Sequence, residues 1–264
     1  MTEPTISKLF DLTGRVALVT GGAGYLGSAM CRALAEAGAS VVVSSRDPER
    51  AQSAAKELPV VGDARHVGVA LDHKDEQSLQ HGFADAVTQA GQVDILVNNG
   101  QGGVAKDWTN VSAEEFESQL QNATGYFLLS RVFRDHIVER DAAGSIVMIG
   151  SMYGMVASYP EAYEDVCPAS PVGYHALKGG IIQMTRHLSV YWATDQIRVN
   201  CLSPGPFPKE TAPAEMVERL KTKSPLRRMG QPHELKGAVL LLASDAGSYL
   251  TGQNLVIDGG WTAW

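Results

Sequence analysis

Cysteine is scarce in this chain, and its few copies lie far apart. Only Cys31, Cys167 and Cys201 occur among 264 residues. An odd number cannot all pair within one chain, and these separations lack the spacing of metal ligands. We therefore expect free thiols in a reducing cytoplasm and no bound metal. Cys31 and Cys201 fall in apolar patterns typical of a core, and none of the three is expected to be catalytic.

Excess positive charge and long apolar runs are also absent from the sequence. The formal net charge is −7 and the pI is about 5.5, which argues against a nucleic-acid-binding surface. No apolar run approaches the roughly 18 residues of a membrane helix, and residues 1–11 lack the basic-then-apolar pattern of a signal peptide. These absences predict a cytoplasmic protein that binds neither nucleic acid nor a membrane.

Short apolar runs alternate with helical patterns along the whole chain. A length of 264 residues and a hydrophobic content of 44% suit one domain, residues 1–264, with a sizeable core. We expect strands at 15–20, 41–43, 67–71, 93–97, 145–149, 198–202 and 254–257, and helices at 28–37, 48–58, 76–90, 113–140, 173–194 and 232–243. This alternation predicts an α/β fold, a Rossmann-type doubly wound parallel sheet with helices on both faces.

One segment, residues 155–171, interrupts the alternation. Its three prolines lie among acidic residues and tyrosines, so it cannot be helical throughout and is expected to be a long loop near the site. Its polar side chains could contact a hydroxylated substrate or simply face solvent.

Glycines are concentrated between the first expected strand and the first expected helix. Residues 20–27 read Thr-Gly-Gly-Ala-Gly-Tyr-Leu-Gly, and in this context glycines permit a tight turn and close approach of the backbone to a pyrophosphate. Gly21, Gly24, Tyr25 and Leu26 are therefore expected to contact a dinucleotide.

Side chains at the end of the second strand determine whether a protein of this type binds NAD(H) or NADP(H). Ser45 offers no carboxylate to a ribose and Arg46 offers a guanidinium for a 2′-phosphate, which predicts NADP(H), unless Arg46 is only a solvated surface residue. Asp47 keeps NAD(H) possible. Asp72, after the third strand, could accept a hydrogen bond from the adenine or begin the next helix as its N-cap.

Two further segments offer polar groups where strands or helices begin. Asn98 and Asn99 follow the fourth strand, where they could contact the cofactor and tie strand ends together, or form a turn. Tyr174 and Lys178 lie four residues apart on a helix, so their side chains are neighbours. A tyrosine with a pKa near ~10 needs such a cation to act near neutrality, although the pair could also be an exposed one.

In this order along the chain, the segments resemble the short-chain dehydrogenase/reductase family, in its compact single-domain subtype, over nearly the full length. The resemblance rests on 20–27, Asp72, 98–100, Asn122, 149–151, Tyr174 with Lys178, 198–200, 203–205 and 257–260. It implies a catalytic tetrad of Asn122, Ser151, Tyr174 and Lys178. It also implies cofactor contacts that include Asn98, Gly100, Tyr174, Lys178, Pro204 and Gly205.

The sequence departs from the family pattern at a few positions. Tyr25 stands where the short-form loop has glycine, so altered packing is expected there. Gln101 replaces a residue after the paired asparagines and could reach the substrate or lie exposed. The family's threonine after Pro204-Gly205 is displaced, with Lys209 near its position and Thr211 beyond.

The resemblance implies interconversion of a secondary alcohol and a ketone by hydride transfer with NADP(H). Ser151 would hydrogen-bond the substrate oxygen, Tyr174 would transfer a proton, and Asn122 would hold a water in the proton relay. The insertion and residues 259–264 look like those of members acting on sugars, sugar acids or polyols, gluconate 5-dehydrogenase-like proteins among them. A dimer or tetramer is expected, with Trp261 and Trp264 used for packing, over a neighbouring site or at a subunit contact.

Two alternatives keep the fold and change the function. One is a non-catalytic NADP(H)-binding regulator, against which the intact Ser151, Tyr174 and Lys178 count. The other is a member whose chemistry gives no net redox change, but the chain leaves little length after Asp258 for an extra substrate domain.

Overall fold

Seven parallel strands form one sheet in the computed structural model, which describes residues 3–103 and 106–263. The strands are β1 (Val16–Val19), β2 (Ser40–Ser45), β3 (Val67–Ala70), β4 (Ile95–Asn98), β5 (Gly144–Ile149), β6 (Ile197–Pro204) and β7 (Asn254–Ile257). Their order across the sheet is β3-β2-β1-β4-β5-β6-β7. Because the order reverses between β1 and β4, the carboxyl ends of these two strands border a crevice. The predicted doubly wound sheet is confirmed.

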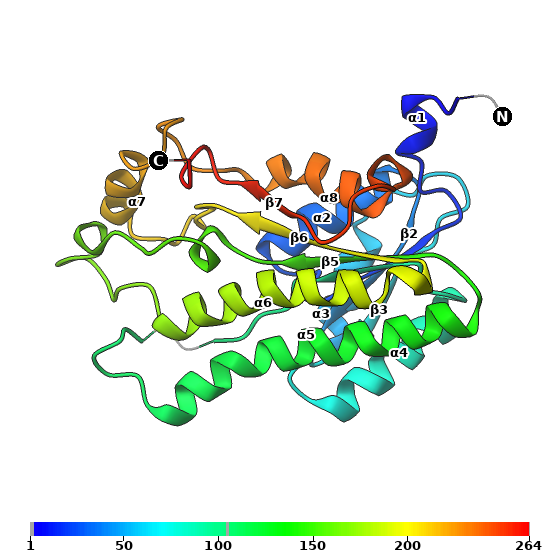
Figure 1. The fold of residues 1–264 in the computed structure, drawn as a ribbon, viewed down its shortest axis with the longest axis horizontal. Coiled ribbons are helices and arrows are strands. Elements are labelled where there is room, and N and C mark those ends of the chain that lie inside the picture. The colour runs from blue at the N-terminus through cyan, green and yellow to red at the C-terminus, as the bar shows by residue number, and fades with distance from the viewer. Residues whose placement is uncertain (1–2, 104–105, 264) are drawn as a thin grey trace.

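Helices cover both faces of this sheet (Figure 1). Helices α4 (Glu76–Ala90), α5 (Ala113–Glu139) and α6 (Val172–Tyr191) pack on one face, and α2 (Tyr25–Glu36), α3 (Pro48–Lys56) and α8 (Lys236–Ala243) pack on the other. Two short helices, α1 (Ile6–Leu9) and α7 (Ala214–Lys221), lie outside these layers. The described residues form no helix that is long and apolar enough to cross a bilayer.

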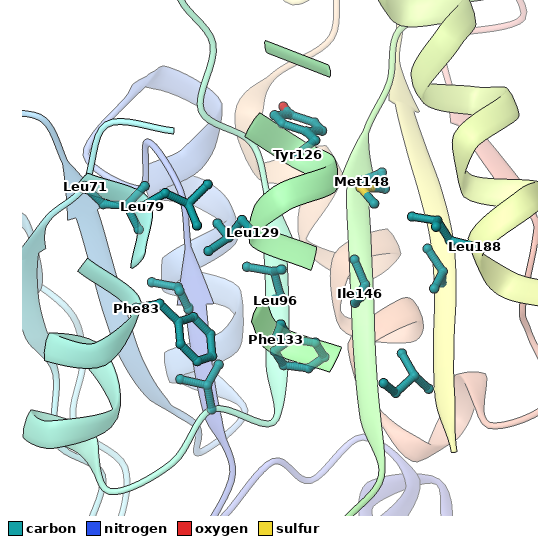
Figure 2. Close-up of a cluster of buried hydrophobic side chains, with 14 of the residues drawn as sticks. Leu71, Leu79, Phe83, Leu96, Tyr126, Leu129, Phe133, Ile146, Met148 and Leu188 are labelled. Atoms are coloured by element: carbon teal, nitrogen blue, oxygen red, sulfur yellow. The ribbon is translucent and has the colours of Figure 1, made fainter. Parts of the chain in front are cut away.

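Neighbouring residues of one strand point to opposite faces, and both faces are apolar. Leu96 packs with Phe83 and Phe133 in the core between the sheet and helices α4 to α6, which Figure 2 shows. Val97 packs with Met30 in the core on the other face. This arrangement explains why the strands read as continuous apolar runs rather than alternating ones.

A third, smaller cluster holds the insertion, residues 155–171. Tyr163 of the insertion packs with Met152, Leu220 of α7, Met229 and Trp261. The insertion contains one short 3-10 helix, Pro160–Ala162, and is otherwise irregular, as expected; its place near the site stays a prediction. Trp261 is 2% exposed, which confirms its packing role and leaves its indole inside its own chain. Trp264 lies outside the described residues.

Several element boundaries differ from the expectations. Helix α2 begins at Tyr25, three residues early, and α6 ends at Tyr191 before a 3-10 turn at Ala193–Asp195. Gln196 then takes a left-handed φ of 59°, which turns the chain into β6. Further 3-10 turns lie at Met152–Gly154, Pro232–Leu235 and Asp245–Gly247. The sequence pattern did not predict α1 and α7, because both are short and together bury only one residue, Leu220.

Gly125 of α5 is required by the close approach of the segment after β3. A Cβ atom at this position would lie 1.8 Å from the carbonyl oxygen of His73, a backbone atom that cannot move independently. We expect Gly125→Ala to lower the stability by about 2 kcal/mol or more and the melting temperature by at least about 4 °C. Gly237→Ala, on an open face of α8, is the control and should cause no loss. An unchanged melting temperature for Gly125→Ala would contradict the packing described.

Candidate functional site

A cleft of about 430 Å³ opens at the carboxyl ends of the strands, within the size range of ligand pockets. Twelve of the thirteen residues predicted to bind the cofactor line it: Gly21, Gly24, Tyr25, Leu26, Ser45, Arg46, Asp72, Gly100, Tyr174, Lys178, Pro204 and Gly205. Residues more than 180 positions apart in the sequence therefore meet at one edge of the sheet.

The glycine-rich turn forms one wall of this cleft. Gly21 has a φ of 59°, and a Cβ atom on Gly27 would lie 2.3 Å from the Gly21 carbonyl oxygen. Gly24 is the N-cap of α2, so the first turn of this helix directs its unpaired N–H groups at the cleft. The hydroxyl of Tyr25 donates to the Pro208 carbonyl at 2.9 Å, so the departure at Tyr25 ties the turn to the loop after β6.

Asn98 and Asn99 have different places. Asn98 does not line the cleft: it is fully buried, and its Nδ2 donates to Ser130 Oγ at 2.9 Å and to Tyr126 O at 3.3 Å. This corrects its expected contact with the cofactor, because its side chain turns into the core between β4 and α5. Asn99 does line the cleft, and its Nδ2 donates to the carbonyls of Thr20 and Gly21.

Cations gather where β2 and β3 end. Arg46, Arg50 and Lys74 all line this part of the cleft, and Arg50 also donates to the Ala23 carbonyl. Asp47 is instead the N-cap of α3, where its carboxylate accepts from the N–H groups of Glu49 and Arg50.

Asp72 lines the cleft and is not a helix cap. The N-cap of α4 is Asp75, while the Asp72 carboxylate accepts from the Lys74 N–H at 3.0 Å. The N-cap alternative for Asp72 is therefore wrong.

Ser151, Tyr174 and Lys178 meet at the other end of the cleft. Tyr174 lies in the first turn of α6, and Lys178 follows one turn later with only 2% exposure. Lys178 Nζ donates to the Ile149 carbonyl at 2.7 Å and lies 5.5 Å from the centroid of the Tyr174 ring. Ser151 follows β5, and its hydroxyl caps the 3-10 turn that begins at Met152.

Burial governs the ionisation of this pair. Removal from water raises the pKa of Tyr174, and the hydrogen bond with Ser151 opposes the increase. The expected lowering of the Tyr174 pKa is therefore wrong in this structure, because desolvation has the largest effect on it and acts in the opposite direction. The same removal from water lowers the pKa of Lys178 to about 8, which leaves its amine mainly protonated at pH 7.

Asn122 does not itself line the cleft. Its side chain is 1% exposed and bonds to Gly102, which does line the cleft: Oδ1 accepts from the Gly102 N–H at 3.0 Å and Nδ2 donates to its carbonyl at 2.7 Å. Gln101, left open by the sequence, lines the cleft as well. Neither Lys209 nor Thr211 lies among the described lining residues; Phe207 does.

Sequence reasoning missed Arg50, His73, Lys74 and Phe207 as lining residues. Their positions in the sequence could have identified the three polar residues. Each of the three polar residues lies within five positions of the end of a strand that borders the cleft. The whole arrangement fits a dinucleotide: glycines permit backbone contact at the α2 terminus, and cations with a carboxylate stand at the β2–β3 end.

Lys178 should cost stability where its amine is charged. Below its folded pKa of about 8 the ammonium is desolvated, and between about pH 8 and its ordinary pKa of 10.5 only the unfolded chain holds this proton, so stability rises with pH there. We expect Lys178→Met to have a melting temperature at pH 7 that matches or exceeds that of the wild type. At pH 9.5 the wild type should have gained stability relative to Lys178→Met. Exposed Lys56→Met is the control and should show no such shift. A Lys178→Met protein less stable by the same amount at both pH values would refute this.

Known proteins resemble the chain over nearly its whole length. A family model described as Enoyl-(Acyl carrier protein) reductase matches residues 22–262. Ribulose-forming D-arabinitol 2-dehydrogenase of Scheffersomyces stipitis is 35% identical over 97% of this chain and 96% of its own. L-tagatose-forming galactitol 2-dehydrogenase of Cereibacter sphaeroides is 34% identical over 97% of this chain and 98% of its own.

Solved structures agree with these matches. A short-chain type dehydrogenase/reductase from Mycobacterium marinum superposes with a TM-score of 0.89, at 31% identity, over 99% of this chain and 100% of that one. A gluconate 5-dehydrogenase from Burkholderia cenocepacia, in complex with NADP and tartrate, gives a TM-score of 0.87 at 28% identity, over 98% and 100%. With the cleft formed by the segments on which the resemblance rested, these matches show that the chain belongs to the short-chain dehydrogenase/reductase family.

Proposed function

We propose that the protein is an NADP(H)-dependent oxidoreductase that interconverts a secondary alcohol and a ketone on a polyol, sugar or sugar acid. The observation that carries the proposal is the convergence of Ser151, Tyr174 and Lys178 at one end of a cleft whose other end holds the glycine turn and Arg46. The polyol dehydrogenases at 34–35% identity and the gluconate 5-dehydrogenase structure support the substrate class. Residues 1–264 would form one domain, which the single sheet of the described residues supports.

The protein's own residues would handle the proton of the reaction. When bound, the nicotinamide supplies or accepts the hydride. The Ser151 hydroxyl donates to the substrate oxygen, and the Tyr174 hydroxyl gives a proton to that oxygen or removes one from it. Lys178, charged at pH 7, favours the ionised form of Tyr174 when the proton leaves. Asn122 would support the proton path from beside the Gly102 segment.

Tyr174 gives the sharpest test of this mechanism. Tyr174→Phe removes only the hydroxyl, so turnover should fall by about 10²- to 10⁴-fold while the dissociation constant for NADPH stays within about threefold. Tyr249→Phe, at a fully exposed position away from the cleft, is the control. Absorbance at the nicotinamide band would be followed with D-arabinitol, galactitol and gluconate in oxidation, with the matching ketoses and keto-acids in reduction, and with an enoyl thioester.

The outcomes separate the alternatives. Alcohol oxidation by the wild type that Tyr174→Phe abolishes supports the proposal, and near-normal activity of Tyr174→Phe overturns the mechanism. Reduction of the enoyl thioester alone would assign a C=C reductase. Tight NADPH binding without turnover of any compound would favour the regulatory alternative.

The preference for NADP(H) rests on the charges beside Ser45. Arg46, Arg50 and Lys74 offer three cations to a 2′-phosphate, while Asp47 is engaged at the α3 N-terminus and does not line the cleft. An arginine-phosphate hydrogen bond contributes about 1.5–3 kcal/mol, or roughly 10- to 150-fold in affinity. We expect Arg46→Ala to weaken NADPH binding by about that factor and NADH binding by less than about twofold. Fluorescence titration measures both, with Arg65→Ala as the control; equal loss for the two dinucleotides would disprove the assignment.

We also infer a homo-oligomer, a tetramer or a dimer, in the cytoplasm. The described part of α6 carries exposed apolar side chains near its carboxyl end, Val190 at 74% and Tyr191 at 67% exposure, which supports a covered face. The three free thiols suit a reducing compartment. Sedimentation should give a multiple of the 28.2 kDa chain mass, and a single-chain mass would exclude the oligomer. Cell fractionation tests the location.

A further inference from the structure

His73 is a buried titratable residue that the proposed mechanism does not use. It lies in the connection between β3 and α4, flanked by Asp72 and Lys74 of the cleft, and is 9% exposed. Its Nε2 lies 2.8 Å from Asn122 Oδ1 on α5. A histidine thus links the segment at the cofactor's adenosine end to the buried asparagine of the tetrad.

The hydrogen bonds of Asn122 decide which atom of His73 carries the proton. Nδ2 of Asn122 donates to two carbonyls, Gly102 O at 2.7 Å and Gln119 O at 2.6 Å, so this end of the amide is the nitrogen. Oδ1 therefore accepts, both from the Gly102 N–H and from His73. His73 must donate from Nε2.

The packing around the ring leaves it little freedom. A Cβ atom on Gly100 would lie 2.9 Å from His73 Nδ1, and one on Gly125 would strike the His73 carbonyl. The ring meets the edge of Tyr126 with centroids 6.2 Å apart, and the Tyr126 ring lies 5.8 Å from Lys178 Nζ. Two glycines and an aromatic ring therefore hold the imidazole against Asn122.

We propose that His73 is a positioning residue that, through Asn122, fixes the Gln101–Gly102 wall of the cleft beside Ser151, Tyr174 and Lys178. Asn122 holds both the N–H and the carbonyl of Gly102, and His73 holds the amide of Asn122 in the orientation that makes both bonds. The expected effect on catalysis rests on the proposed function. The hydrogen bond itself can be tested without any turnover.

The charge of His73 does not switch this contact near neutral pH. Removal from water lowers its pKa; the bond with Asn122 and the charge of Asp72 oppose this, while Lys74 and Arg46 add to it. From α5 the ring contacts the neutral side chains of Asn122 and Tyr126. The imidazole is neutral at pH 7, and Nε2–H donates in both charge states.

Three variants of His73 distinguish the effect of its hydrogen-bond donor from the effect of its ring. His73→Gln places an amide donor near Nε2, His73→Asn places one near Nδ1, and His73→Phe keeps a ring without a donor. For His73→Phe we expect a kcat reduced about tenfold or more, with the dissociation constant for NADPH within about threefold. His73→Gln should restore kcat to within about threefold of the wild type, whereas His73→Asn should not. Exposed His81→Phe is the control.

Combination with Asn122→Ala tests whether His73 acts through Asn122. The double variant His73→Phe/Asn122→Ala should lose no more kcat than Asn122→Ala alone, and its melting temperature should fall by less than the two single decreases together. Additive losses in both measurements, a wild-type kcat for His73→Phe, or no rescue by glutamine would overturn the proposal. If the wild type turns over none of the compounds, the proposed function fails, and the melting temperatures alone then decide the His73–Asn122 contact.

Discussion

The close approach of the carboxyl ends of β1 and β4 is the constraint on which the cleft depends. Thr20 Oγ1 accepts from the N–H groups of Asn99 and Gly100, both at 2.8 Å, and Asn99 Nδ2 returns a bond to the Thr20 carbonyl. Gly27 has no room for a side chain against the Gly21 carbonyl, and Gly21 combines a left-handed φ with close contact to the Gly100 backbone. The strand order reverses at this point, so the helices after β1 and β4 separate and leave the crevice open.

The end of the cleft that contains Tyr174 and Lys178 reduces the stability of the folded chain. Lys178 is an amine almost fully removed from water, held by a single described hydrogen bond to the Ile149 carbonyl. Tyr174 beside it has a pKa raised by burial. Such an arrangement gains little for folding and is typical of functional sites, where a perturbed pKa serves chemistry. The long apolar strands β5 and β6 and the cores on both faces of the sheet provide the stability that offsets it.

Local patterns predicted the fold well because strong hydrophobic periodicity specifies it. The helix at 76–90 and the strand at 254–257 were placed to the residue, and every predicted strand was found. Predictions failed where an interaction distant in sequence decides the outcome. Asn98 turns into the core toward Ser130 rather than to the cleft. Tyr25 begins α2 early, and its hydroxyl reaches Pro208, 183 residues further along the chain.

The sequence by itself determined the parallel sheet, the glycine turn and the order of the polar residues that follow the strands, because these depend on local periodicity and backbone freedom. Only the tertiary structure decided which of those residues face the cleft, since that depends on side-chain direction and on packing between layers. It placed Arg50 and Lys74 beside Arg46, set Asp47 at a helix terminus, and brought His73 against Asn122. It also reversed the expected direction of the Tyr174 pKa, because burial is a property of the folded chain and not of four-residue spacing.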